Sequence, residues 1–330
     1  MTLIEAQLDS IPGICTVTRY GFDETTNEDD VLPIFIELPH GATEAEHLYA
    51  LKQRIGDYKN DRYDRFFFVN TDQGSPEYAA WLAEHLIDLG FLDAHLGGET
   101  DPMTLRTLVG RIRVVVLRSL LPRTIVDVNR NWAIDEAVRK AANLTGTCGA
   151  FIKSEADLTL LRDLYEQYQA MARAGYAWAC GNEGYAFNLH TYAPITVSLI
   201  EGEFIVDTLE RAYLENYADY PLRPGIQTIT TPPGEEAMLA PRPMVEAVEH
   251  AYHMAGFSVK RDEPYPLHPA ATGYGHCARY PGRVFSMEVR RDLLVDHFEP
   301  FEIMAISPAK VAQVTLPFLL GVVRALLPAE

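Results

Sequence analysis

The sequence predicts an α/β fold in which a mostly parallel or mixed twisted sheet is covered by helices on both faces. Short runs rich in Ile, Val and Phe alternate along the chain with segments of helical periodicity. Of the 330 residues, 48% are hydrophobic, which is enough to build a substantial core. No shift in composition marks a boundary, so we expect a single domain over residues 1–330.

Seven short apolar runs are expected to form the strands. Their length and their content of β-branched and aromatic residues favour strands over helices. The runs are 34–38, 66–70, 113–117, 124–128, 185–189, 196–200 and 283–289.

Helix starts are marked by capping residues and by proline at the first helical position. The four starts are Ser75-Pro76, Ser154 with Asp157, Pro241 or Pro243, and Ser307-Pro308. The apolar tail 312–327 is interrupted by Pro317 and Arg324, so we expect a packed C-terminal helix and no membrane span. The stretch 219–243 is rich in Pro, Gly and Thr, and it is expected to be a long surface excursion near an active-site rim.

Charge and cysteine usage exclude several classes of function. The formal net charge is −18 and the pI is about 5.0, so binding to nucleic acid or to an anionic membrane is not expected. The N-terminus shows no secretory signal pattern. The four cysteines form no CxxC pair, which is typical of reduced structural thiols in a cytoplasmic protein.

Polar groups with catalytic potential stand at or beside the C-terminal end of five of the apolar runs. In open α/β sheets, ligands bind outside the carboxyl ends of the strands, so these groups are expected around one crevice. They are Pro39-His40, Asn70-Thr71-Asp72, Asn129-Arg130, His190 and Glu288.

Two histidines with one carboxylate and a water molecule make a common catalytic zinc sphere. His40 and His190 supply the imidazoles, and Zn²⁺ or a similar divalent metal is the expected cofactor. Asp72 and Glu44 compete for the third place. Asp72 is preferred because Gly41-Ala42 after His40 suggests a loop, whereas Glu44 would need that segment to be helical.

Five segments resemble the N-formylglutamate amidohydrolase family, which is similar in fold and site plan to the zinc carboxypeptidases and aspartoacylases. The segments are PHGA at 39–42, TDQGSPEYAAWLAEHL at 71–86, RTIVDVNR at 123–130, NLHTY at 188–192 and SMEVRRDLL at 286–294. The resemblance implies that the domain is catalytic. Where the carboxypeptidases have HxxE, this chain has HGATE. The resemblance therefore leaves open whether Asp72 or Glu44 is the third metal ligand. Residues 201–243 could also reshape the pocket.

The resemblance implies a role for each matched position. His40, Asp72 and His190 match the metal ligands, and Glu288 matches the catalytic glutamate. The other three matched residues belong to an RxxxDxNR pattern and are Arg123, Asn129 and Arg130. Arg123 is expected to stabilise the oxyanion and Asn129 with Arg130 to bind a substrate carboxylate, although the two arginines could exchange these roles.

The expected activity is hydrolysis of the amide bond of a small anionic N-acyl amino acid, N-formyl among the candidates, by metal-activated water. Two alternatives stay open. One is a carboxypeptidase-like peptidase on the same scaffold, and the other is a catalytically silent anion-binding protein. The partner in each case is a small anionic ligand, and the sequence gives no oligomeric state.

Overall fold

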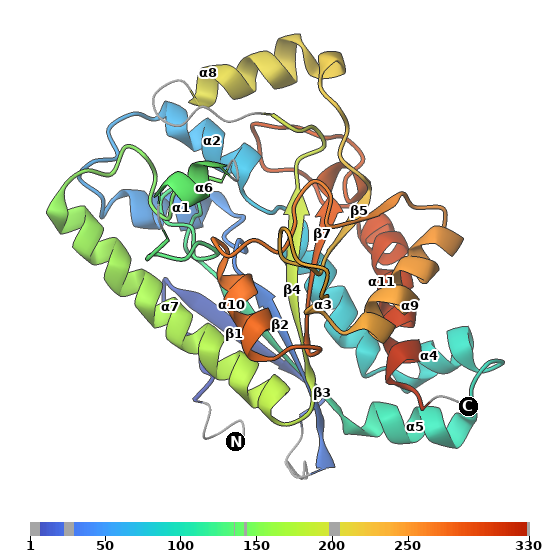
Figure 1. The fold of residues 1–330 in the computed structure, drawn as a ribbon. Helices are drawn as coiled ribbons and strands as arrows, with labels where there is room; N and C mark the ends of the chain where they lie inside the picture. Colours follow the sequence, from blue (N-terminus) through green and yellow to red (C-terminus); the bar gives the residue numbers. More distant parts are fainter. Residues whose placement is uncertain (1–6, 23–29, 135, 142–143, 198–204, 329–330) are drawn as a thin grey trace.

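The computed structural model describes residues 7–22, 30–134, 136–141, 144–197 and 205–328. Within these ranges one sheet has the strand order β1-β3-β2-β4-β7-β5-β6 (Figure 1). The strands are β1 (Cys15–Tyr20), β2 (Leu32–Leu38), β3 (Ile112–Ser119), β4 (Tyr185–Tyr192), β5 (Ile226–Ile229), β6 (Val259–Arg261) and β7 (Val284–Arg290).

Helices connect and cover these strands. They are α1 (Ala45–Lys52), α2 (Arg62–Asn70), α3 (Ser75–Leu86), α4 (Leu89–Leu96), α5 (Pro102–Arg111), α6 (Glu136–Ala141), α7 (Glu155–Gly181), α8 (Ile205–Glu210), α9 (Arg242–Met254), α10 (Thr272–Arg279) and α11 (Pro308–Leu326), with short helical turns η2 (Arg211–Glu215), η3 (Tyr217–Asp219) and η4 (Arg291–Leu293).

The sheet is mixed, as the sequence predicts. Strands β3, β2, β4 and β7 are mutually parallel, while β1 and β5 pair antiparallel with β3 and β7. The carboxyl ends of β2, β4 and β7 therefore lie at one edge of the sheet. Register places Glu37 opposite Asn188 and His190 opposite Glu288, which brings polar residues of three strands together there.

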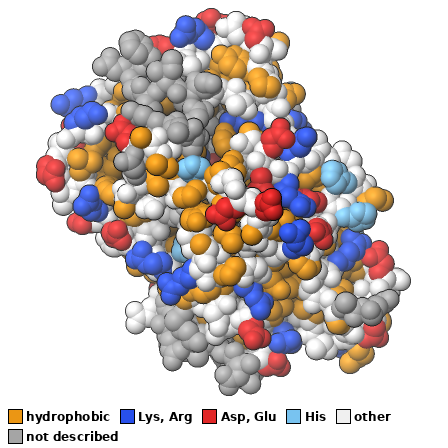
Figure 2. Space-filling model, in the orientation of Figure 1, with side chains coloured by type: hydrophobic (Ala, Val, Ile, Leu, Met, Phe, Trp, Pro, Cys, Tyr) orange, Lys and Arg blue, Asp and Glu red, His pale blue; other side chains and the backbone are white. Residues whose placement is uncertain are grey.

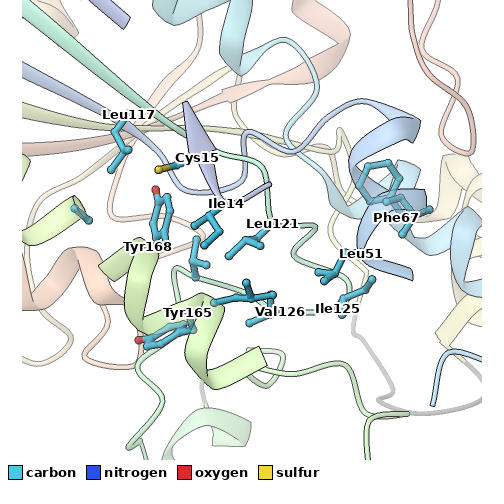
Figure 3. Packing of buried hydrophobic residues seen from close by; sticks show 14 of the residues in the cluster. Ile14, Cys15, Leu51, Phe67, Leu117, Leu121, Ile125, Val126, Tyr165 and Tyr168 are labelled. Atoms are coloured by element: carbon cyan, nitrogen blue, oxygen red, sulfur yellow. The ribbon is translucent and has the colours of Figure 1, made fainter. Parts of the chain in front are cut away.

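Helices bury both faces of the sheet, which confirms the predicted α/β class. Figure 1 shows α7 on one side, and α3, α9 and α11 on the other. On the α7 side, a Cβ at Gly175 would meet the Phe35 ring at 2.1 Å, so only glycine allows α7 this close to β2. Figure 3 shows Tyr165 and Tyr168 of α7 packed near Ile14 and Leu121 in this layer.

The observed helix starts agree closely with those predicted from the sequence. The Ser154 side chain accepts a hydrogen bond from the Asp157 amide at the start of α7. Helix α3 begins at Ser75, but its N-cap is Gly74, one residue before the predicted cap. Gly74 has φ +88°, and a Cβ there would lie 2.6 Å from Leu294, so this turn requires glycine.

The C-terminal helix α11 packs against α9 and α3, as the prediction of a packed helix requires. Among the described residues it is the one helix whose length and composition would allow it to cross a membrane, and half of that apolar window is buried within the protein.

On the face in Figure 2, acidic and basic side chains are interspersed.

Four expectations about local structure were wrong or incomplete. Residues 66–70 belong to helix α2, and residues 124–128 form turns with a single bridge at Val126. Residues 196–197 are not in a strand, and 198–200 lie outside the described residues. The stretch 219–243 does not only run over the surface, because it contributes β5 to the sheet.

Candidate metal centre

His40, Asp72 and His190 meet in the interior at the carboxyl edge of the sheet. Their side chains are at most 5% exposed. Asp72 Oδ2 lies 3.2 Å from His40 Nδ1 and 3.0 Å from His190 Nδ1, and the two Nδ1 atoms are 3.1 Å apart. The three ligand candidates of the preferred prediction are therefore in mutual contact.

Outer neighbours determine which ring nitrogen of each histidine carries a proton. His40 Nε2 lies 2.8 Å from Asp127 Oδ1, and a carboxylate can only accept, so Nε2–H donates. His190 Nε2 lies 2.6 Å from the carbonyl oxygen Oδ1 of Asn188 and donates likewise. In the neutral form that binds a metal ion, each ring then has its lone pair on Nδ1, which faces Asp72.

This arrangement fits a divalent metal ion. A tetrahedral ion with bonds of about 2.0–2.1 Å holds its ligand atoms about 3.3 Å apart, close to the 3.0–3.2 Å separations found here. Asp72 Oδ1 pairs with the Arg123 guanidinium at 3.4 Å, and this neighbouring cation favours the charged form of the carboxylate. One anionic oxygen and two imidazole lone pairs therefore converge on one point.

Hydrogen bonds hold the Asp72 segment between the loop after β2, which carries His40, and strand β4, which carries His190. The Thr71 hydroxyl donates to the Ala42 carbonyl, in the loop that carries His40, at 2.7 Å. The Thr191 hydroxyl donates to the Gln73 carbonyl at 3.0 Å, next to His190 on β4. Asp72 is thus fixed to the loop after β2 and to β4 through its chain neighbours.

Glu44, the competing carboxylate, lies outside this centre. It is the N-cap of α1, its side chain is 54% exposed, and it pairs with Arg118 at 2.7 Å. Among the described residues, the group able to hold a metal is His40, Asp72 and His190. The geometry supports Asp72 as the third ligand.

Glu288 lies beside the histidines, within β7 and opposite His190 on β4. Its Oε2 atom is buried without a hydrogen-bond partner among the described residues. It does not pair with Arg290, which donates to Asp292. Burial raises the pKa of Glu288 to about 7, and the negative charge of Asp72 acts in the same direction. A carboxylate of this pKa suits general acid–base chemistry.

The RxxxDxNR residues also reach the centre. Arg123 donates to Asp72 Oδ1 at 3.4 Å and to Asp127 Oδ2 at 3.3 Å. Burial would lower the pKa of Arg123, but these two carboxylates raise it, so it stays cationic. Asn129 Nδ2 lies 3.3 Å from His190 Nε2, and Arg130 donates to the Thr145 carbonyl at 3.2 Å.

A cavity of about 730 Å³ opens onto this centre. His40, His190 and Glu288 line it, and so do the three predicted residues of the RxxxDxNR pattern. Its wall is otherwise largely apolar, with residues from α2, the segment after β4, α8, η2 and the loop before α10. That part of the wall includes Phe66, Ile195, Leu209, Tyr213 and Leu267. Six of the seven predicted site residues line this cavity. The seventh, Asp72, is buried against the histidines.

The expectation that every site group stands at or beside the C-terminal end of a strand was wrong for Asp72 and Asn129. Only His40 comes just after a strand, β2. Asp72 follows helix α2, and Asn129 follows the turns at 124–128. His190 and Glu288 lie within β4 and β7. The predicted residues nevertheless surround one cavity.

Sequence reasoning missed four contributing residues. Asp127 and Asn188 accept from the histidines, while Arg223 and Arg291 line the cavity. Asp127, Asn188 and Arg291 lie within motifs that carry the family resemblance, so their position beside the predicted residues was an available signal. Arg223 lies in the Pro/Gly/Thr-rich stretch, where no pattern distinguishes it.

The chain matches no known protein-family model and no curated protein. It is similar to the crystal structure of an N-formylglutamate amidohydrolase from Ralstonia eutropha JMP134, with 16% identity, TM-score 0.46, and coverage of 93% of this chain and 96% of that chain. A gene product from Agrobacterium tumefaciens has 14% identity, TM-score 0.48 and coverage of 94% of both chains. A metallo-carboxypeptidase from Burkholderia cenocepacia has 10% identity and TM-score 0.37, covering 97% of this chain and 66% of that chain.

Proposed function

We propose that this protein is a cytoplasmic, metal-dependent hydrolase that cleaves the amide bond of a small anionic N-acyl amino acid. The observation that carries the proposal is the convergence of His40 Nδ1, Asp72 Oδ2 and His190 Nδ1 in a buried site beside a cavity. When bound there, Zn²⁺ or a similar divalent ion supplies Lewis-acid activation of water and of the amide carbonyl.

Glu288 is the proposed general base. It faces the cavity next to His190, and its Oε2 atom is free to accept a proton from a water molecule. The same carboxyl then donates that proton to the leaving nitrogen of the amide. A pKa near 7 suits both transfers at neutral pH.

Arginines of the cavity wall provide the complementary charge. Arg123 is held over the centre by Asp72 and Asp127, so its guanidinium can stabilise negative charge on the carbonyl oxygen as the amide is attacked. Arg130 and Asn129 are proposed to bind the α-carboxylate of the substrate, for which arginine offers planar geometry.

Arg291 supports a substrate with a second anionic group. It is 3% exposed and lines the cavity, and it donates to the Val69 carbonyl at 2.8 Å. No carboxylate of the described residues lies within ion-pair distance of Arg291. Burial lowers its pKa to about 10, so it is still charged at neutral pH. A buried cation without a counterion is costly, and a substrate carboxylate would offset that cost. An N-acyl or N-formyl derivative of an acidic amino acid has this second charge.

The size of the cavity favours one second candidate. A volume of about 730 Å³ is in the range that accommodates drug-sized ligands. It leaves room beside the metal centre for an acyl group larger than formyl or for the C-terminal end of a peptide. A carboxypeptidase-like peptidase on the same scaffold is therefore the alternative activity.

Turnover assays distinguish these possibilities. The zinc-loaded protein is offered N-formyl and N-acetyl derivatives of acidic and neutral amino acids, and peptides with a free C-terminus. Preferred cleavage of the N-acyl amino acids supports the proposal, and preferred cleavage of the peptides supports the alternative. Glu288→Gln should keep its metal and lose turnover by about 10²–10⁴-fold. Binding of the anions without any turnover would contradict the proposal and indicate a silent binding protein.

The role of Arg291 has its own test. Arg291→Lys removes the planar guanidinium but keeps the charge, so KM should rise for acidic N-acyl amino acids more than for neutral ones. Arg290→Lys is the matched control, since Arg290 pairs with Asp292 and is absent from the cavity wall. Equal KM changes for acidic and neutral substrates would exclude a second carboxylate site at Arg291.

A further inference from the structure

Glu37 is a buried carboxylate that contacts Asn188, a neighbour of the metal centre, and it takes no part in the proposed reaction. Glu37 lies within β2 and is 1% exposed. It accepts hydrogen bonds from Tyr168 at 3.0 Å, Tyr176 at 2.7 Å and Asn188 Nδ2 at 2.7 Å. No cationic side chain of the described residues lies within ion-pair distance of it.

Burying a carboxylate without a cation costs free energy that hydrogen bonds must offset. Two of the three donors come from α7. Burial and the nearby Glu37 raise the pKa of Tyr168 and of Tyr176 well above the ordinary value, so both hydroxyls keep their protons and donate. The third donor, Asn188, connects the carboxylate to the metal centre.

The Glu37 carboxylate determines which way the Asn188 amide faces. Since the carboxylate accepts and cannot donate, the NH₂ group of Asn188 must face it. The carbonyl oxygen Oδ1 of Asn188 then faces His190 Nε2 at 2.6 Å. An amide turned the other way would present NH₂ to His190 Nε2 and would favour a proton on Nδ1.

We propose that Glu37 is a positioning residue for the metal centre: through Asn188 it keeps the proton of His190 on Nε2 and the lone pair on Nδ1. This inference rests on the metal site of the proposed function, but not on the substrate or on the reaction. Asp127 keeps the proton of His40 on Nε2 in the same way, because it accepts a hydrogen bond from that nitrogen directly. The two histidines thus depend on different carboxylates, one in direct contact and one acting through an amide.

The first measurement is the tautomer of His190 in metal-free wild-type protein, read from ¹⁵N–¹H correlations of the histidine rings. The inference requires a proton on Nε2. Glu37→Gln replaces the carboxylate by an amide that can also donate, so Asn188 is free to turn. His190 should then shift towards the Nδ1–H form, and the zinc Kd should increase by about ten- to a hundredfold, as for other outer-shell changes.

Tyr168→Phe is the matched control, because it also removes a hydrogen bond to Glu37 but leaves the contact between Glu37 and Asn188. Its zinc Kd and its His190 tautomer should equal those of the wild type. If Glu37→Gln does not fold, Asn188→Ala takes its place, since it deletes the acceptor of the His190 proton.

Three results would overturn the inference. They are an Nδ1–H tautomer of His190 in the wild type, a folded Glu37→Gln variant with unchanged tautomer and zinc Kd, and an Asn188→Ala variant with unchanged zinc Kd. A wild-type protein that binds no metal would contradict the proposed function, and the tautomer measurements would still test the role of Glu37. A bound metal without amide hydrolysis would contradict the activity and leave this inference standing.

Discussion

The Nδ1 atoms of His40 and His190 lie 3.1 Å apart in the buried interior. The other nitrogen of each ring already donates to an outer partner, Asp127 for His40 and Asn188 for His190. Two lone pairs therefore face each other beside the charged oxygen of Asp72. Electron-rich atoms in such contact repel one another unless a cation lies between them.

Removal of the metal should therefore destabilise the protein. A ligand that binds only the folded state adds about 2.7 kcal/mol to the free energy of unfolding when its free concentration is 100 times its Kd. We expect EDTA to lower the Tm and added Zn²⁺ to restore it. His190→Ala should show no zinc-dependent change in Tm. Identical melting of the wild type with EDTA and with zinc would refute the prediction.

The choice of Asp72 over Glu44 as third ligand predicts opposite outcomes for two carboxylate-to-amide variants. Asp72→Asn should weaken zinc binding by more than about 100-fold, because loss of a ligand exceeds the effect of an outer-shell change. Glu44→Gln should leave zinc affinity unchanged, since Glu44 is exposed and paired with Arg118. Zinc competition with a chromophoric chelator measures both, and a loss confined to Glu44→Gln would reverse the assignment.

Asp127 should act on the metal without touching it. Asp127→Asn replaces a group that only accepts hydrogen bonds by one that can also donate, so the proton of His40 is no longer held on Nε2. Zinc binding should therefore weaken by about ten- to a hundredfold. Asp101→Asn is the control, because Asp101 caps α5 at an exposed site. The chelator competition assay applies here too, and equal zinc Kd values for the two variants would rule out the outer-shell role.

The raised pKa of Glu288 leads to a prediction of how the stability of the metal-free protein depends on pH. Its pKa is raised from an ordinary 4.5 to about 7 in the folded state, so the folded protein holds this proton more tightly than the unfolded chain. The resulting stabilisation is full below about pH 4.5 and is lost as the pH rises through about 7. Glu288→Gln cannot titrate and lacks this loss.

Urea unfolding between pH 5 and 8 tests this prediction. The free energy of unfolding of the wild type, relative to Glu288→Gln, should fall by about 1–3 kcal/mol across that interval. A constant difference between the two proteins would show that Glu288 has an ordinary pKa.

The central strands β2, β3, β4 and β7 could be predicted because each contains a short, mostly apolar run that is buried on both faces. Two equally apolar runs were misassigned for physical reasons. In residues 66–70, Phe66, Phe67 and Val69 face the core from a helix, since tertiary packing overrides their strand propensity. In residues 124–128, Asp127 accepts from His40 and from the Asn129 amide, which stabilises a turn. Strand β5 was missed because it has four residues within a Pro/Gly/Thr-rich stretch.

The site could be predicted further than the elements that carry it. Residue type and motif identified His40, Asp72 and His190, whose convergence depends on the pairing of strands far apart in sequence. Periodicity could not decide between Asp72 and Glu44, because the choice depends on hydrogen bonds such as that from Thr71 to Ala42. Glu37 carries no motif signal, since its role follows from contacts with α7 and β4.

A crystal structure of the zinc-loaded protein, with anomalous diffraction at the zinc absorption edge, would show which side chains bind the metal. We expect one anomalous peak within about 2.0–2.2 Å of His40 Nδ1, His190 Nδ1 and Asp72 Oδ2. The ring nitrogens Nε2 should keep their contacts to Asp127 and Asn188. A peak bound elsewhere, or no peak at saturating zinc, would contradict the assignment of His40, Asp72 and His190 as the metal ligands.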